Sequence, residues 1–350
     1  MANSVLNAPH FQSEKAAFAY VEASLWADGR SCPHCGVLDQ SKPMNGKTTR
    51  IGLYKCYACR KPFTVRMGTI FESSHLALHL WLQVIHLMCA SKKGISTRQI
   101  QRMLSCSMKT AWFLGHRIRE VMAPGAAAGP LGGKGKIVEA DETYIGTADG
   151  KRDKKAWGGM GHKQKIVSLV ERGGQIRSQR VKEATKLTII DILESNVLPG
   201  TILHTDGSGI YKDTGLKHEA VDHSTTYVRA GKNGRKVHTN TLEGFFSVFK
   251  RGMVGVYQHC GEQHLNRYLA EFDFRQNTRA KLEISDVSRA SIALKQAKGK
   301  RLTYRTTERL LKPKVAAAVT KLKSIGLGMI PASKTVNLPD EYRQGDMLHG

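Results

Sequence analysis

The stretch KIVEADETYI, at residues 136–145, is a predicted β-strand. Successive side chains of a strand point to opposite faces of a sheet, so Asp141 shares a face with Glu139 while Glu142 points the other way. A carboxylate among apolar neighbours in a strand usually needs a partner or a metal ion. The alternative is an edge strand whose Asp141 faces solvent.

A second carboxylate, Asp206, closes the apolar run TILHTD at residues 201–206 and is followed at once by Gly207. This run is a predicted strand, and the glycine lets the backbone turn sharply at its end. Strand ends are common places for chemistry in open α/β sheets. An aspartate before a turn can also serve only as a cap, which is the simpler interpretation.

A third carboxylate, Glu243, lies in the predicted helix NTLEGFFSVFK at residues 240–250. At helical spacing Asn240, Glu243 and Lys250 share one polar ridge, and the opposite face is aromatic. Glu243 could then bind a metal ion while Lys250, two turns further on, holds a DNA phosphate. The alternative is an ordinary amphipathic helix with a solvated Glu and Lys.

The composition indicates a polyanionic partner. The 350 residues carry a formal charge of +25 with a sequence pI of about 9.9, and charge of this size attracts nucleic acid. A membrane surface would attract it too, but no apolar run approaches the roughly 20 residues of a spanning helix. The N-terminus lacks the plan of a secretion signal. We therefore expect a cytoplasmic protein, associated with the nucleoid when bound to DNA, that holds Mg²⁺ against phosphate.

Four of the seven cysteines form two Cys-x-x-Cys pairs, CPHC at residues 32–35 and CYAC at 56–59. This spacing is typical of two zinc knuckles, in which four thiolates hold one structural Zn²⁺ in a closed tetrahedral site. His34 could replace one ligand, although inside the knuckle we expect it to face solvent. A disulfide framework does not fit, because the other cysteines are scattered through helical patterns. The predicted ligands are Cys32, Cys35, Cys56 and Cys59.

Residues 76–122 have helical periodicity. Within KGISTRQIQRML, at residues 93–104, Ser96 is a predicted N-cap, and a second helix follows a short turn and covers residues 108–122. Two short helices around a tight turn resemble a helix-turn-helix, which would bind DNA. The alternative is a small bundle with a solvated basic face made of Lys109, His116, Arg117 and Arg119.

The following segment predicts an α/β domain with a mixed sheet. KIVSLVE and QIRSQRV flank Gly173-Gly174 as a hairpin, a helix follows at 186–197, residues 207–239 are rich in loops, and two helices cover about 241–251 and 261–275. Gly, Ala and Pro mark a linker before this domain. The predicted organisation is a zinc ribbon at 11–72, helices at 76–122, a linker at 123–135, the α/β domain at 136–278 and a basic tail at 279–350.

Several stretches resemble the insertion-sequence DDE transposases that carry an N-terminal zinc ribbon, of the IS1595 type with an ISXO2-like domain. They are ADETYIG at 140–146, HTDG at 204–207, HTNTLEGFFSVFKR at 238–251 and YLAEFDFRQN at 268–277. The resemblance implies a ribonuclease-H-like catalytic domain in which Asp141, Asp206 and Glu243 bind two divalent ions, Mg²⁺ or Mn²⁺. Lys250 matches the basic residue that follows the third acid, and Asn240 is an alternative to Glu243 or its helper.

The resemblance also implies cleavage at the terminal repeats of an element and strand transfer into target DNA, by a homo-oligomer that holds both ends. Two other functions stay open. One is a zinc-ribbon DNA-binding regulator with an inert catalytic domain, and the other is a structure-specific nuclease that cuts without joining. Lesser candidates for DNA contact, each with a structural or solvated role as the simpler interpretation, are His204, His223, His238, His259 and the basic run at 151–155.

Overall fold

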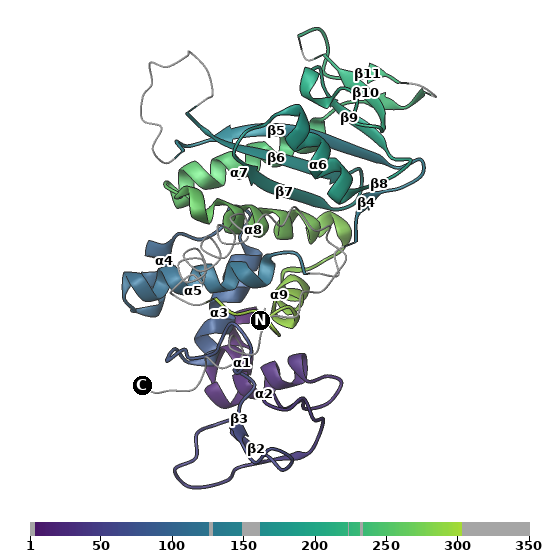
Figure 1. The fold of residues 1–350 in the computed structure, drawn as a ribbon. Coiled ribbons are helices and arrows are strands. Elements are labelled where there is room, and N and C mark those ends of the chain that lie inside the picture. The colour runs from purple at the N-terminus through teal and green to yellow at the C-terminus, as the bar shows by residue number, and fades with distance from the viewer. Residues whose placement is uncertain (1–3, 126–128, 149–161, 223, 232–233, 303–350) are drawn as a thin grey trace, which may run out of the picture. The chain divides into compact units, whose positions relative to one another are not determined.

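A mixed sheet of five strands forms the centre of the second half of the chain, in the order β10-β9-β5-β6-β7 (Figure 1). Strands β10, β9 and β5 are parallel, whereas β5, β6 and β7 pair antiparallel in turn. The predicted α/β class with a mixed sheet is therefore confirmed. The computed structural model describes residues 4–125, 129–148, 162–222, 224–231 and 234–302. The strands are β5 Ile137–Ile145, β6 Gln164–Glu171, β7 Ile176–Val181, β9 Ile202–Asp206 and β10 Lys217–Val221.

Helices cover both faces of this sheet. Val138 and Ala140 of β5 pack in one buried cluster with Ile189 and Leu193 of α6. Helices α7 and α8 pack on the opposite face, where Ile166 of β6 lies among their apolar side chains. The predicted hairpin and all three of these helices are confirmed. Their bounds are α6 Lys186–Asn196, α7 Asn240–Gly252 and α8 Leu265–Asn277.

Strand β5 presents acidic residues to both faces of the sheet. Since Val138 and Ala140 point to α6, Glu139 and Asp141 point to the side of α7. Glu142 points to the α6 side, where its carboxylate accepts a hydrogen bond from the Tyr211 hydroxyl at 2.6 Å. The predicted division, with Asp141 and Glu139 on one face and Glu142 on the other, is confirmed.

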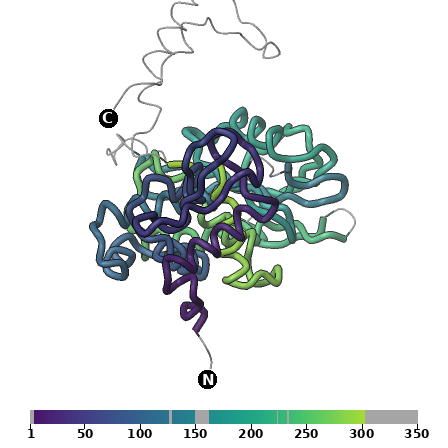
Figure 2. Tube along the Cα trace, turned by 90° about the horizontal axis from the view of Figure 1, so that it is seen from below, coloured from purple at the N-terminus to yellow at the C-terminus, as the bar shows by residue number. Residues whose placement is uncertain are grey.

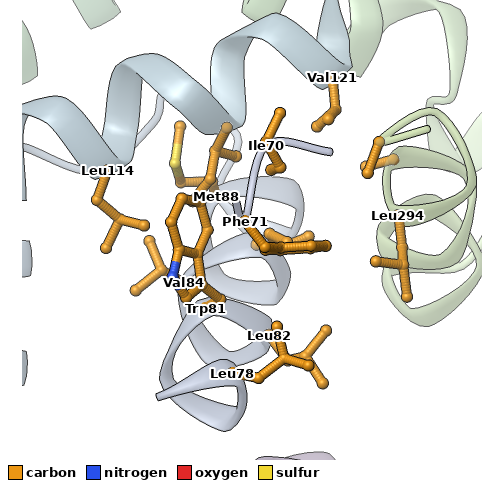
Figure 3. Packing of buried hydrophobic residues seen from close by; sticks show 14 of the residues in the cluster. Ile70, Phe71, Leu78, Trp81, Leu82, Val84, Met88, Leu114, Val121 and Leu294 are labelled. Atoms are coloured by element: carbon orange, nitrogen blue, oxygen red, sulfur yellow. The ribbon is translucent and has the colours of Figure 1, made fainter. Parts of the chain in front are cut away.

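The N-terminal helices build a second core around two aromatic rings. Phe71 and Trp81 pack edge to face with their ring centroids 5.2 Å apart. Leu114 and Val121 of α5 and Leu294 of α9 belong to the same buried cluster (Figure 3). Distant segments of the chain therefore share one core. The helices are α1 Pro9–Gln12, α2 Glu14–Leu25, α3 Leu78–Ala90, α4 Thr97–Leu104, α5 Met108–Met122 and α9 Asp286–Lys295.

Serine caps start both helices of the predicted helix-turn-helix. The Ser96 hydroxyl accepts a hydrogen bond from the N–H of Gln99 at the start of α4, and the Ser107 hydroxyl accepts one from the N–H of Thr110 at the start of α5. Each bond satisfies one backbone donor that the first turn of a helix leaves unpaired. The predicted N-cap at Ser96 and the predicted helix at 108–122 are confirmed.

The basic side chains of α5 do not form a solvated face. His116, Arg117 and Arg119 are buried, and of the predicted basic face only Lys109 is exposed. Nε of Arg119 donates to the Glu271 carboxylate of α8 at 2.7 Å. The interpretation as a bundle with a solvated basic face is therefore wrong for these three residues. Their charge is buried because α5 is packed against both α3 and α8.

The segment from 279 to 302 contributes to the N-terminal core and is not only a basic tail. Helix α9 packs against α2 and α3, and Ala293, Leu294 and Ala297 are buried. Figure 2 shows the yellow-green segment of α9 beside the purple segments of the N-terminus. The residues from 303 onward, the basic run at 151–155 and His223 lie outside the described residues.

Short strands and turns complete the described part of the chain. The segment at 207–239, predicted to be rich in loops, supplies strand β10 to the central sheet. Among the helices that the structure describes, none is long and apolar enough to cross a membrane. The small sheets are formed by β1 Ser41–Pro43, β2 Tyr54–Cys56 and β3 Pro62–Phe63, by β4 Leu131–Gly132 and β8 Val197–Leu198, and by β11 Arg229–Ala230 and β12 Lys236–Val237. Single turns are η1 Val5–Asn7, η2 Gly209–Tyr211, η4 Met253–Tyr257, η5 Glu262–His264 and η6 Ala280–Leu282.

Candidate metal centre and carboxylate pocket

Four cysteine sulfurs converge in the N-terminal ribbon. The Sγ atoms of Cys32 and Cys59 lie 3.7 Å apart, as do those of Cys35 and Cys56. All four Sγ atoms lie within 4.8 Å of one another. Thiolates about 2.3 Å from a tetrahedral Zn²⁺ are about 3.8 Å apart, whereas sulfurs in a disulfide are about 2.05 Å apart. The four cysteines therefore form a zinc-binding ribbon site.

The cluster of apolar side chains around the four cysteines is small. Cys32 and Cys56 share a buried cluster with Tyr54 and Phe63, against which the partly buried Trp26, Val37 and Met67 pack. His34 is exposed, as expected, and its Nε2 lies 3.2 Å from the carbonyl oxygen of Pro62, so it does not replace one of the four cysteines. A closed zinc site contributes folding free energy to a ribbon of this kind.

The three acidic residues predicted from the sequence line one pocket of about 440 Å³. Asp141 comes from β5, Asp206 from the last residue of β9 and Glu243 from the first turn of α7. We call this the carboxylate pocket. Its complete lining is Asp141, Asp206, Gly207, Ser208, Asp222, Ser224 and Glu243.

The pairing of β5 with β9 explains where the carboxylate pocket opens. The two strands pair in parallel only as far as Glu139 and His204. Beyond that pair β5 stays paired with β6 through Ile145, while β9 stays paired with β10 through Asp206. Asp141 and Asp206 thus stand two residues past the last shared pair, where the strands separate. The carboxyl ends of diverging parallel strands are favoured places for ligands.

Burial and like charges raise the pKa of Asp141 to about 8. Burial is the largest cause, and the charges of Asp206, Glu142 and Glu243 add to it. The N–H of Glu142, which donates to Asp141 Oδ1 at 2.8 Å, opposes the rise. Acids that repel one another are stabilised by a cation, and carboxylate oxygens are the ligands that Mg²⁺ prefers. The donor set of the carboxylate pocket therefore fits a divalent cation.

The carboxylate pocket is wider than the cysteine site. Among the described residues, only the four cysteines bring three or more ligand atoms within 4.8 Å of one another. Asp206 Oδ1 accepts a hydrogen bond from the N–H of Ser208 at 3.1 Å, which orients this carboxylate at the strand end. Closed ligand sets are typical of structural metal sites and open ones of catalytic sites. The pocket therefore has room for a substrate group between the acids.

Asn240 and Lys250 lie on the same helix as Glu243 but do not belong to the lining of the carboxylate pocket. Asn240 is the first residue of α7 and Lys250 lies in its last turn, and both are exposed. The apolar face of α7 is buried as predicted and consists of Leu242, Phe245, Phe246 and Phe249.

The sequence did not point to Asp222, which also lines the carboxylate pocket. It directly follows β10, whose Val221 pairs with Asp206. Its Oδ1 accepts hydrogen bonds from the N–H and the hydroxyl of Ser224, at 2.9 and 2.7 Å. The signal that could have found it is an acid directly after an apolar residue, the same pattern that identified Asp206. This pattern could not be recognised at Asp222, because strand β10 was not predicted.

The histidines differ in their surroundings. His204 is buried, and burial together with the neighbouring Arg172 lowers its pKa to about 4. Burial and Arg172 also lower the pKa of His238. His259 is exposed and lines a different pocket, of about 500 Å³, at the end of β5.

Comparisons with known proteins match the two segments that contain the carboxylate pocket and the cysteine site. Residues 130–277 match the family described as ISXO2-like transposase domain, and residues 12–62 match the family described as transposase zinc-ribbon domain. A protein of Halobacterium salinarum, described as an uncharacterized protein in transposable element ISH50, is 28% identical over 285 residues, which are 76% of this chain and 91% of that protein. The first match contains Asp141, Asp206 and Glu243, and the second contains the four cysteines.

Proposed function

The chain belongs to the insertion-sequence transposases of the IS1595 type, and we propose that it cuts the ends of its element and joins them to target DNA. The convergence of Asp141, Asp206 and Glu243 on the carboxylate pocket carries this proposal. The order of the sheet, with three antiparallel strands beside two parallel ones, supports a ribonuclease-H-like fold for the domain at 136–278.

In this proposal Asp141, Asp206 and Glu243 hold two divalent cations, Mg²⁺ or Mn²⁺. Such ions, when bound, lower the pKa of a bound water and stabilise the attacking and leaving oxygens of an in-line displacement at phosphorus. The protein supplies the arrangement of the acids. The sheet holds Asp141, the turn at Ser208 orients Asp206, and the buried aromatic face of α7 fixes Glu243. Burial, and after it repulsion by the neighbouring acids, raises the pKa of Asp141, and a bound cation would relieve that repulsion.

Charge and exposure support DNA as substrate and partner. The net charge of +25 provides attraction along a DNA backbone. We propose that Lys250, exposed two turns after Glu243, holds a phosphate and that Asn240 assists Glu243 or replaces it as the third ligand. The zinc ribbon and the α4–α5 pair, with Arg98 and Arg102 exposed, are proposed to recognise the terminal repeats. Joining needs both ends at once, so a homo-oligomer on DNA is part of the proposal.

The test is incubation of the zinc-loaded full chain with labelled terminal-repeat DNA, target DNA and Mg²⁺. Strand-transfer products support the transposase. Cutting without joining would instead assign a structure-specific nuclease, and binding without cutting would assign a regulator with an inert catalytic domain.

Substitutions connect this reaction to the carboxylate pocket. Asp141→Ala, Asp206→Ala and Glu243→Ala should each abolish cutting while DNA binding persists. Asp213→Ala is the matched control, because this exposed acid pairs with Lys186 of α6 on the other side of the sheet. Cutting at the normal rate by either aspartate variant would contradict the assignment.

A further inference from the structure

A second layer of polar residues lies directly beneath the carboxylate pocket. Glu139, His204 and Thr241 each precede one of the pocket acids by two residues, on β5, β9 and α7 respectively. Glu139 and His204 are the last residues that pair between β5 and β9. On a strand, residues two apart share a face, so this pair stands on the same side of the sheet as Asp141 and Asp206.

The carboxylate of Glu139 joins β5 to the beginning of α7. The Glu139 side chain is fully buried. Its Oε2 accepts a hydrogen bond from the backbone N–H of Thr241 at 3.1 Å, and its Oε1 accepts one from the Thr241 hydroxyl at 3.0 Å. Thr241 is the second residue of α7, and the N-cap Thr239 makes no capping bond with its own side chain. Glu139 therefore supplies from another element a cap of the kind that helices need at their N-terminus.

Arg172 holds this carboxylate in place and connects it to β9. Its Nε donates to Glu139 Oε1 at 3.0 Å. Its Nη2 lies 3.2 Å from His204 Nδ1 and donates to the carbonyl oxygen of His238 at 3.1 Å. Its Nη1 donates to the carbonyl oxygen of Lys236 at 2.9 Å. One guanidinium thus links β5, β9 and the chain that leads into α7, because its three nitrogens point to different partners.

We propose that Glu139 is a positioning residue, which fixes the first turn of α7 against β5 and so sets the place of Glu243 relative to Asp141 and Asp206. This inference rests on the proposed function of the carboxylate pocket and adds to it the device that holds the third ligand. Glu139 does not line the pocket itself. Residues that orient metal ligands in this way change metal affinity by about 10- to 100-fold when they are replaced.

The test compares three variants of the zinc-loaded full chain. Glu139→Gln keeps the size of the side chain but replaces one acceptor oxygen with an NH₂ group. Thr241→Val removes only the hydroxyl donor, and Thr241→Ser retains it. The control is Asp273→Asn, because Asp273 is also buried and also joins a helix to a strand, accepting from the N–H and the hydroxyl of Ser178 of β7, each at 2.7 Å.

Two readouts are measured on each variant. The first is Mn²⁺ affinity by electron paramagnetic resonance titration, with Asp141→Asn defining the part of the signal that belongs to the carboxylate pocket. The second is amide hydrogen exchange in residues 240–245. We expect Glu139→Gln to weaken the pocket affinity by about tenfold or more and to speed exchange in the first turn of α7. Thr241→Val should weaken the affinity and speed the exchange to a smaller extent. Thr241→Ser and Asp273→Asn should leave both readouts near wild type.

The outcomes separate this inference from the proposed function. If wild-type protein binds Mn²⁺ in the pocket and both Glu139→Gln and Thr241→Val bind it equally well, with unchanged exchange, the positioning role of Glu139 is wrong while the proposed function stands. If Glu139→Gln does not fold, Thr241→Val decides alone. If Asp141→Asn removes no Mn²⁺ binding from wild type, both the proposed function and the inference fail.

Discussion

Asp141 and Asp206 face one pocket from two parallel strands, just beyond the last residues that those strands pair. The charge of Asp206 is, after burial, the largest cause that raises the pKa of Asp141 to about 8. Without a cation, the ionised form of this pocket is therefore disfavoured in the folded state. The same repulsion makes the pocket a good place for a divalent ion.

The pH dependence of stability should reveal the raised pKa of Asp141, which burial and this repulsion together cause. The folded pKa of Asp141, about 8, is above its ordinary value of 3.8, so the folded protein keeps a proton that the unfolded chain releases. The stability contributed by this group falls as pH rises from about 4 to about 8 and is constant above. Asp141→Asn lacks this loss. In Mg²⁺-free buffer its free energy of unfolding should therefore exceed that of wild type by a margin that grows as pH rises, on the order of a few kcal/mol at most.

Urea unfolding of both proteins at pH 5, 7 and 9 measures that margin. Saturating Mg²⁺ should raise the free energy of unfolding of wild type more at pH 9 than at pH 5, and should change that of Asp141→Asn little. If the free energies of unfolding of the two proteins stay parallel over this pH range, the pKa of Asp141 is not raised in the folded protein.

The cysteine site should hold about one zinc per chain, as its four thiolates require. Cys32→Ser should lose the metal and expose the ribbon to proteases, because the small cluster around the site cannot fold it alone. Native mass spectrometry and limited proteolysis measure both effects. Cys106→Ser is the control, since Cys106 lies outside the site, and full zinc in Cys32→Ser would rule out the ligand set.

The ion pair between Arg119 and Glu271 should be important for stability. Both side chains are buried, and Glu271 also pairs with Arg275, so Glu271→Gln would leave two buried guanidinium groups without a counterion. Breaking such a pair typically costs about 3–5 kcal/mol. Lys136→Met removes the exposed partner of Glu171 and should cost less than about 1 kcal/mol. Equal losses in chemical denaturation would contradict this account.

DNA binding should depend on Lys250 through the phosphate backbone. Lys250→Met should weaken binding at all sequences and lower the slope of log affinity against log salt by about one. Lys186→Met, an exposed lysine of α6 on the opposite side of the sheet, should leave that slope unchanged. Fluorescence anisotropy at several salt concentrations compares the two, and an unchanged slope for Lys250→Met would place the DNA elsewhere.

Local patterns predicted the parts of the site that repeat along one element. The alternation of β5 placed Asp141 with Glu139, and helical spacing placed Glu243 opposite the aromatic face of α7. The cysteine spacing predicted the zinc ligands because chelation needs only the right residues at the right separation.

Contacts between distant segments could not be predicted in this way. Strand β10 has the mostly polar sequence KHEAV, so its place beside β9 follows from parallel pairing and not from periodicity. The burial of Arg119 depends on Glu271, 152 residues away. The role of Arg172 beneath the carboxylate pocket depends on partners from three other segments, Glu139, His204 and His238.

Crystallography with Mn²⁺ and anomalous scattering, on the zinc-loaded protein bound to its terminal-repeat DNA, would locate the cations that Asp141, Asp206 and Glu243 are proposed to hold. We expect anomalous peaks in the carboxylate pocket at about 2.1–2.3 Å from carboxylate oxygens of Asp141, Asp206 and Glu243. A crystal whose Mn²⁺ peaks all lie away from Asp141 and Asp206, while DNA ends occupy the pocket, would contradict this proposal.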